Sequence, residues 1–363
     1  MADAIKTIPG YEHRVASHCE SGSLRNLLQH AGVEVSEPMV FGVGSGPAFY
    51  YLFFARGPST FPLVGIRNPP SKIFKNVRKL CGVDFVLGEL PTVEAAIAEA
   101  DAHLERGTPV AASVDMYRMK YLPGFMRVHA PFHFIVLVGR EGATYAVSDP
   151  YHPEVAALAR EDLEAAWSTH APMARDNLLA YLRARPGAID WKRASARAIG
   201  RTCRDMVLPP AVRSALSFIG VEGMRTYAKA IRKWPARYRG ARLREGILFN
   251  AVAFEDQGTG GAAFRLMYGA FLQEVADLFA SSEVAELGER LIGHGRRWRA
   301  LSRRLVVVGR SIPLQDEAFD DWYAAHGQEV EAGLAEVSQQ FLEFAEFEQR
   351  FFTDLGSAAR RLR

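Results

Sequence analysis

A cysteine at the start of a predicted helix is the first residue in the sequence that suggests chemistry. Cys19 lies in the run HCESG, and leucines at helical spacing follow it until Gly32. A thiol becomes a good nucleophile as its thiolate, and the partial positive charge at a helix N-terminus favours that anion. A small buried apolar side chain is an equally good interpretation of a lone cysteine, so this position alone does not decide between them.

A base and an acid follow at positions typical of strands. His133 interrupts the apolar run FHFIVLVG, and Asp149 begins an Asp-Pro turn directly after the short strand predicted over residues 144–147. A histidine on a rigid strand can take the proton of a thiol, and a carboxylate on the neighbouring strand can fix its tautomer. A satisfied core histidine and an ordinary turn are the alternative interpretations. The order Cys, His, Asp along the chain joins the three residues into one hypothesis.

The elements that must hold these residues change type along the chain. Spacing and turn signals predict helices over residues 17–30, 68–81 and 93–107, with a glycine-rich loop over 42–46. Apolar and β-branched runs predict strands over 49–54, 110–114, 132–138 and 144–147. After about residue 158 strands nearly vanish, and residues 211–233, 261–280, 284–305 and 317–355 are predicted to be helical, with a connector over 182–201.

Size and composition allow this arrangement. With 363 residues, of which 48% are hydrophobic and 23% charged, the chain can form two packed cores. No apolar stretch approaches the roughly 20 residues of a membrane helix and the N-terminus lacks a signal segment, so we expect a soluble, cytoplasmic protein. Three cysteines without a CxxC pair favour free thiols over disulfides or a metal site.

The charge balance says little about partners, but its distribution says more. A net charge of +3 gives no reason to expect a nucleic-acid partner. Arginine and lysine crowd residues 232–244 and 296–304, where they would suit an acidic protein or simply cover a solvated helix face. The sequence leaves open whether the chain forms a homodimer.

Together these motifs resemble a known family. HCESGSLRNLLQHAG, SEPMVFGVGSGPAFYY, FHFIVLVG with His133, the SDP turn with Asp149, and TGGAAFRLMYGAFLQE are similar to the butirosin biosynthesis protein H family. The resemblance covers most of the chain. It implies an α+β fold: a papain-like cysteine peptidase domain over residues 1–158, followed by a mainly helical domain over 159–363 that is catalogued as a domain of unknown function.

The resemblance also implies an activity. Members of this kind move an acyl group from an acyl carrier protein thioester, by way of the active-site cysteine, to an amine of a small acceptor in secondary metabolism. Cys19 would be the nucleophile, His133 the general base and then acid, and Asp149 the orienting acid. No bound cofactor or metal is expected; the phosphopantetheine arm of the carrier protein would bring the acyl group.

Further residues are expected to border the site. Papain-like peptidases place a glutamine six residues before the cysteine as an oxyanion donor, and this chain has His13 there. His18 adjoins the nucleophile. Gly44 would allow the backbone to pass close to the active site, and Tyr50 would form a wall of the acyl pocket. Asp115 and Tyr117 would contact the acceptor amine, and Arg265 would contact a phosphate or carboxylate. For each, ordinary packing or surface polarity is the alternative interpretation.

Two other classes of function are also compatible with this sequence. A thioesterase, cysteine peptidase or cyclase would keep the three residues but end with water or an internal nucleophile. A binding or scaffold protein would only bury Cys19, and its thiol would then react slowly with an alkylating agent.

Overall fold

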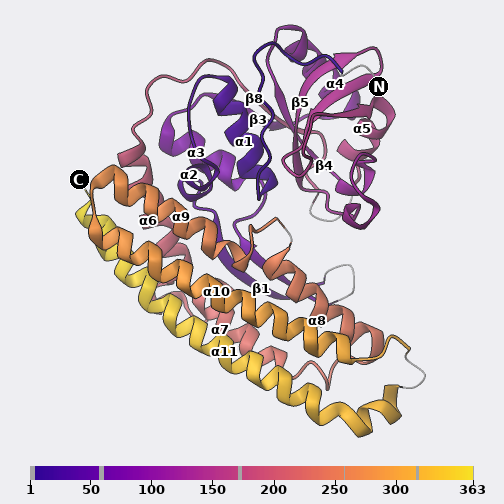
Figure 1. Ribbon diagram of the computed structural model, residues 1–363, viewed down its shortest axis with the longest axis vertical. Coiled ribbons are helices and arrows are strands. Elements are labelled where there is room, and N and C mark those ends of the chain that lie inside the picture. The colour runs from indigo at the N-terminus through magenta and orange to yellow at the C-terminus, as the bar shows by residue number, and fades with distance from the viewer. Residues whose placement is uncertain (1–4, 57–60, 171–173, 257, 316–318, 363) are drawn as a thin grey trace. The chain divides into compact units, whose positions relative to one another are not determined.

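The chain forms two compact units in a computed structural model that describes residues 5–56, 61–170, 174–256, 258–315 and 319–362 (Figure 1). The first unit comprises residues 1–44 and 69–191, and the second comprises residues 45–68 and 192–363. The helices and strands of the first unit are α1 Cys19–His30, α2 Glu37–Val43, α3 Lys72–Cys81, β3 Phe85–Glu89, α4 Val93–Glu105, β4 Val110–Val114, β5 His133–Glu141, β6 Thr144–Ser148, β7 Ala156–Ala159, α5 Arg160–Trp167 and β8 Leu178–Leu182.

An antiparallel sheet organises the first unit. Its strand order is β3-β8-β4-β5-β6-β7, so β5, which begins with His133, is an inner strand. Its residues from His133 to Gly139 are all buried, because side chains cover both faces of an inner strand. The continuous apolar run in the sequence reflects this burial.

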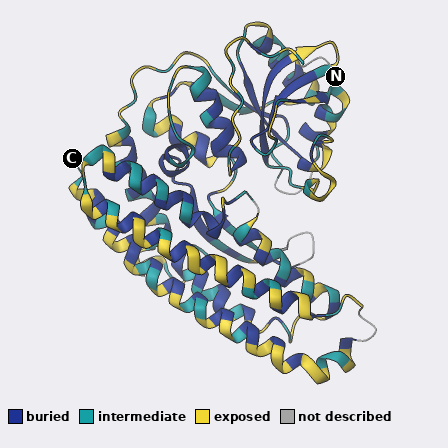
Figure 2. Ribbon diagram, in the orientation of Figure 1, coloured by how far each residue is buried: buried dark blue, intermediate teal, exposed yellow. Residues whose placement is uncertain are grey.

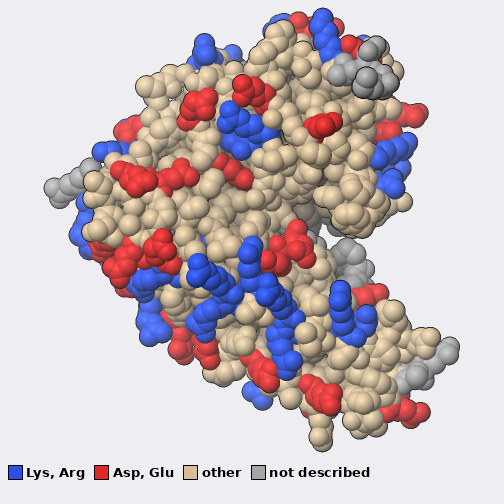
Figure 3. Space-filling model, viewed as in Figure 1, with Lys and Arg blue, Asp and Glu red and all other residues tan. Residues whose placement is uncertain are grey.

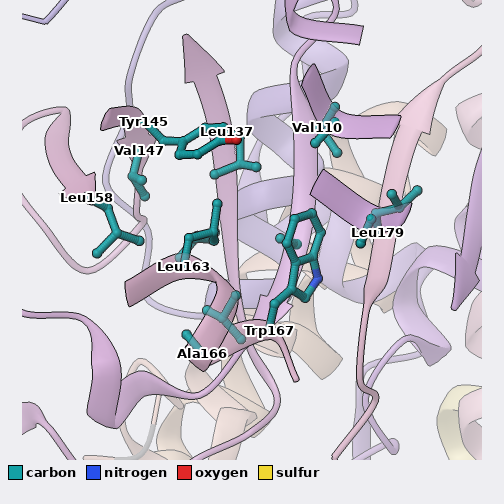
Figure 4. Close-up of a cluster of buried hydrophobic side chains, with 14 of the residues drawn as sticks. Val110, Leu137, Tyr145, Val147, Leu158, Leu163, Ala166, Trp167 and Leu179 are labelled. Atoms are coloured by element: carbon teal, nitrogen blue, oxygen red, sulfur yellow. The ribbon is translucent and has the colours of Figure 1, made fainter. Parts of the chain in front are cut away.

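Helices α4 and α5 pack on one side of this sheet and form a hydrophobic core with it. Figure 4 shows the part of this core that α5 contributes. The Trp167 indole is buried and donates to the carbonyl of Leu178 at 2.8 Å, so its one polar group is satisfied. On the other side, Phe134 of β5 stacks on Phe74 of α3 at 5.4 Å between ring centroids. The side chains labelled in Figure 4 are Val110, Leu137, Tyr145, Val147, Leu158, Leu163, Ala166, Trp167 and Leu179.

The second unit is helical except for one β-hairpin. Helices α10 and α11 are its longest and lie side by side (Figure 1). Its elements are β1 Pro47–Arg56, β2 Pro62–Arg67, α6 Trp191–Met206, α7 Gly220–Ile231, α8 Gly240–Glu255, α9 Arg265–Phe279, α10 Ser282–Ser311 and α11 Phe319–Arg361.

Aromatic residues fill the core of the second unit. Phe49 of β1 lies within 6.4 Å of the rings of Tyr227, Trp298 and Phe341, measured between centroids. The helices therefore bury one face each and leave the other exposed, as the alternating colours along α10 and α11 show (Figure 2).

The predicted fold class is confirmed: an α+β first unit carries the cysteine, and the rest is mainly helical. The boundary differs from the predicted residue 158, because β8 pairs with both β3 and β4 and so belongs to the first sheet. Residues 45–68 also belong to the second unit. Of the glycine-rich loop expected over residues 42–46, Gly42 and Val43 end α2, and residues 44–46 lie outside helices and strands as predicted. Helix α6 begins inside the expected connector.

Among the described residues, every helix is too short or too polar to cross a membrane.

Candidate active site

Cys19 is the first residue of α1 and lies beside the sheet. One turn further along the same helix, the Ser23 hydroxyl donates to the carbonyl of Phe134 on β5 at 3.1 Å. This bond ties the helix to the strand that begins at His133. Cys19 retains 6% of its surface exposed, so the thiol lies in a nearly closed site.

The N-terminus of α1 is capped from two directions. Glu37 accepts the backbone N–H of Ser17 at 2.9 Å and that of His18 at 2.8 Å. The His18 ring accepts the N–H of Ser21 at 3.3 Å as the N-cap and meets the ring of Phe41 edge-on at 5.8 Å. His18, which was predicted to border the site, is therefore the cap that fixes where the helix begins.

A close backbone contact brings this helix start to the acid. The N–H of Ala16 donates to the carbonyl of Pro150 at 2.9 Å, next to Asp149. A Cβ at Gly22 would lie 2.4 Å from that of Ala16 and 3.1 Å from that of Pro150, so only glycine allows this approach. The helix of Cys19 is thereby locked against the turn of Asp149.

The three residues predicted to act together meet in the structure. His133 Nε2 lies 2.8 Å from Asp149 Oδ2, and both side chains are buried. His133 also shares a hydrogen bond with the Cys19 thiol. Because Nε2 faces the carboxylate, Nδ1 is the ring nitrogen left for the sulfur.

Opposed effects set the ionisation of this group. Burial alone would lower the pKa of His133, but the charge and hydrogen bond of Asp149, and then those of Cys19, raise it to about 10. Burial alone would raise the pKa of Asp149, but the His133 imidazolium and the donors around the carboxylate hold it below its usual value. The pair is therefore an ion pair at neutral pH, with the proton on the imidazole.

Two tyrosines that were not among the sequence candidates complete the acid's surroundings. The Tyr121 hydroxyl donates to Asp149 Oδ2 at 2.9 Å, and the backbone N–H of Tyr151 donates to Oδ1 at 2.9 Å. The Tyr151 ring also lies 5.0 Å from that of His133. An Asp-Pro turn signals the N–H contact, because aspartate often accepts a hydrogen bond from the residue two positions later. No local pattern signals Tyr121.

His13 is held away from the role of oxyanion donor. Its Nδ1 lies 2.7 Å from the Ser148 hydroxyl, and its Nε2 lies 2.9 Å from the carbonyl of His152. A carbonyl only accepts, so Nε2 carries the proton and Nδ1 accepts from Ser148. Both ring nitrogens are therefore engaged within the protein, and donation from His13 to a substrate oxygen stays a prediction.

Asp115 organises the loop between β4 and β5. Its carboxylate accepts the N–H of Ala130 at 2.9 Å and lies 2.8 Å from His129 Nδ1. The Asp115 side chain is 3% exposed, so it braces the loop from inside, and its contact with an acceptor amine stays a prediction. Tyr117 is 46% exposed and stacks on His129 at 4.2 Å, which leaves it accessible on the same loop.

Gly44 and Tyr50 have local structural roles. Gly44 ends α2, its carbonyl accepts from the Asn76 amide at 2.7 Å, and a Cβ there would lie 2.6 Å from Ile73. Tyr50 lies in β1 of the second unit, where its hydroxyl donates to Asn68 at 3.2 Å.

Arg265 is a core residue of the second unit. It forms a two-pronged ion pair with Glu348 at 2.9 and 2.8 Å and donates to the carbonyl of Ala263 at 2.6 Å. Burial alone would raise the pKa of Glu348, but Arg265 and then His294 hold it at about 2. At 1% exposure Arg265 is buried in this core, and its contact with a phosphate or carboxylate ligand stays a prediction.

Three arginines of the second arginine-rich segment form ion pairs within the protein. On α10, Arg297 pairs with Glu343 at 2.7 Å, Arg299 with Glu255 at 2.9 Å, and Arg304 with Glu336 at 2.7 Å. On the face drawn in Figure 3, Lys and Arg side chains gather over the helical unit, with Asp and Glu side chains around them. Such surface pairs contribute little to stability, but they reduce the attraction of this face for an acidic partner.

Comparisons with known proteins match both halves of the chain. A model of the N-terminal domain of butirosin biosynthesis protein H matches residues 18–150, and a model of a domain of unknown function (DUF4872) matches residues 161–355. Among solved structures, a putative C39-like peptidase from Bacillus anthracis matches at 18% sequence identity and a TM-score of 0.35, covering 50% of this chain and 100% of that one. No protein in the curated set matches. Cys19, His133 and Asp149 all lie within the first matched range.

Proposed function

Because the chain belongs to the family in which a butirosin biosynthesis protein H N-terminal domain precedes a DUF4872 domain, we propose that this papain-like cysteine enzyme of biosynthesis is an acyltransferase. In this proposal Cys19 accepts an acyl group from an acyl carrier protein thioester and passes it to an amine of a small acceptor. The observation that carries the proposal is the hydrogen-bonded series of Cys19, His133 and Asp149.

The first half-reaction moves the acyl group to the enzyme. The Cys19 sulfur attacks the thioester carbonyl carbon, and the negative charge that develops on the carbonyl oxygen needs donors such as the backbone N–H of Cys19. The bond to the phosphopantetheine sulfur then breaks, and the His133 imidazolium gives its proton to that leaving sulfur. One thioester replaces another, so the net free-energy change of this step is small.

The second half-reaction forms the amide. The acceptor amine attacks the acyl carbon on Cys19, His133 takes a proton from the attacking nitrogen, and the Cys19 sulfur leaves. Asp149 stabilises the imidazolium in both half-reactions and fixes the ring so that Nδ1 faces the sulfur. The enzyme ends in its starting state.

Burial of the site favours transfer over hydrolysis. Cys19 is 6% exposed and His133 3% exposed, while Asp149 has no exposed surface. An acyl-enzyme thioester in such a site meets few water molecules, so a bound amine competes well for it. The proposal therefore requires that a bound amine reach the acyl carbon before water does.

Mass spectrometry of the intact protein tests the proposal. After incubation with an acylated carrier protein, we expect the acyl mass on Cys19, stable in buffer and discharged within one turnover by an added amine. Cys19→Ala is expected to show no acyl mass, whereas Cys81→Ala, which changes a cysteine far from the triad in sequence, is the matched control and is expected to behave like the native chain.

Two results would count against the proposal. Rapid loss of the acyl group to water without any amine would indicate a hydrolase. Acyl transfer that continues in Cys19→Ala would remove the nucleophile from the mechanism.

A further inference from the structure

The Tyr121 hydroxyl and the His133 imidazole share one oxygen of the acid. Tyr121 Oη lies 2.9 Å from Asp149 Oδ2, and His133 Nε2 lies 2.8 Å from the same atom. The other oxygen, Oδ1, accepts the backbone N–H of Tyr151. Among the residues that the structure describes, three donors therefore face this carboxylate, and Tyr121 and His133 share the same oxygen.

The Tyr121 proton is directed to the carboxylate. Its oxygen also lies 3.3 Å from the Met119 sulfur, but a hydroxyl has one proton, and an ionised carboxylate is a much stronger acceptor than a thioether. Burial, and then the charge of Asp149, raise the pKa of Tyr121 well above its usual value, so the hydroxyl stays protonated and remains a donor. Tyr121 thus acts on Asp149 at every pH at which the enzyme works.

We infer that Tyr121 is a positioning residue for the proposed thiol chemistry: by donating to the oxygen of Asp149 that pairs with His133, it weakens the hold of that carboxylate on the imidazolium proton. A carboxylate whose charge is shared with a second donor attracts the first donor less strongly. This matters because the imidazolium must give up its proton to a leaving sulfur, and a base bound too tightly to its proton is a poor acid. The benefit to catalysis rests on the proposed function, but the effect of Tyr121 on the hydrogen bond between Asp149 and His133 does not.

Other titratable groups around the pair are few among the described residues. His133 faces the Cys19 thiol of α1, the carboxylate of Asp149 after β6 and the ring of Tyr151. The His152 ring meets that of Tyr121 edge-on at 5.5 Å. On the N-terminal segment, Tyr11 and His13 both contact the Ser148 hydroxyl, one residue before the acid. The NMR signals of the His152 ring must therefore be assigned separately from those of His133.

The test is the titration of the His133 ring by nitrogen NMR in full-length protein. Cys19→Ala serves as the common background, because the loss of the thiol removes two of the causes that raise the pKa of His133 and brings its titration to lower pH. Adding Tyr121→Phe is expected to raise the pKa of His133 by about 0.5 or more, since the carboxylate then binds the imidazolium without a competing donor.

Tyr11→Phe in the same background is the matched control. It also removes a buried tyrosine hydroxyl, one that donates to Ser148 at 3.0 Å, but it leaves Asp149 untouched. We expect the His133 titration to be unchanged there. An unchanged or lowered pKa in Tyr121→Phe, or an equal rise in both variants, would overturn the inference.

A second variant preserves the buried hydroxyl and is expected to change the pKa of His133 in the opposite direction. A fluorinated tyrosine at position 121 retains the hydroxyl and is a stronger donor, so it should lower the pKa of His133; a rise would contradict the inference. Failure of the proposed function would be seen elsewhere, as a native Cys19 that iodoacetamide alkylates no faster than Cys81 or Cys203. The two hypotheses therefore fail on different measurements.

Discussion

Asp149 is the residue on which the site's electrostatics depend. It has no exposed surface, and a carboxyl group in that position would normally be neutral. The hydrogen bonds from Tyr121 and Tyr151, and the imidazolium of His133, keep it ionised instead. The buried Asp149 carboxylate thus keeps its negative charge, which stabilises the His133 imidazolium next to the Cys19 thiol.

The pH dependence of folding should report this ion pair. The pKa of His133 is raised from 6.5 to about 10, so its stabilising contribution is complete below pH 6.5 and is lost as the pH rises through about 10. In Asp149→Asn the main cause of the rise is gone, and the decline in the free energy of unfolding over this pH range should become smaller. Urea unfolding at a series of pH values measures it.

Asp84→Asn is the control, since the Asp84 side chain is 55% exposed and its pair with Arg183 spans 3.9 Å. In Asp84→Asn the free energy of unfolding should decline with rising pH as steeply as in the native chain. A decline in Asp149→Asn as steep as in the native chain would show that the His133–Asp149 pair does not set it.

At the scale of elements, the sequence allows prediction of those with local signals. Helix α1 and strands β4, β5 and β6 were predicted close to their observed bounds, because periodicity and turn residues are local properties. Cys19, His133 and Asp149 were predicted to act together from their order along the chain and from the resemblance to a known family, and in the structure His133 and Asp149 lie within hydrogen-bond distance. Helix α2 was missed because Gly42 disfavours a helix, whereas the Ser36 cap and the burial of Phe41 stabilise one.

The rest depends on contacts between distant residues. Strand β8 is placed between β3 and β4 by pairing that no local pattern encodes. Tyr121 reaches Asp149 across 28 residues, and Arg265 reaches Glu348 across 83. An arginine at the start of a helix is as typical of a ligand site as of a buried ion pair. The role of Arg265 could therefore not be predicted from the sequence without the fold.

The buried pair of α9 and α11 gives a prediction on the helical unit. Arg265→Met leaves the Glu348 charge without its main partner and should lower the free energy of unfolding by about 3–5 kcal/mol. The double variant Arg265→Met, Glu348→Leu removes both charges and should recover most of that loss. Thermal or urea unfolding measures both.

The same two variants test whether Arg265 contacts a phosphate or carboxylate of the substrate. If Arg265 only holds the core, the folded double variant should accept and transfer acyl groups at the native rate. A double variant that is stable but has lost acyl transfer would restore Arg265 to the site.

At the scale of the whole molecule, the chain passes between the two units more than once. The hairpin of residues 45–68 belongs to the second unit although it interrupts the first in sequence. Phe61 of this hairpin lies 4.6 Å from the Trp234 ring and 4.3 Å from that of Tyr238, and Gly246 has no Cβ that would collide with it. The helical unit therefore takes part of its core from the N-terminal half of the sequence.

This arrangement predicts how the chain can be divided. The N–H of Asn68 donates to the carbonyl of Gly46 at 2.9 Å, so the two ends of the hairpin lie together and a short Gly-Ser linker can replace it. Residues 1–191 with that replacement should fold and keep Cys19 reactive toward iodoacetamide, whereas residues 192–363 alone should lack a cooperative unfolding transition, since the hairpin's aromatic side chains are missing from their core. Circular dichroism during thermal unfolding and the rate of Cys19 alkylation measure the two outcomes. A cooperative transition in residues 192–363 without the hairpin would show instead that the helices form a complete core by themselves.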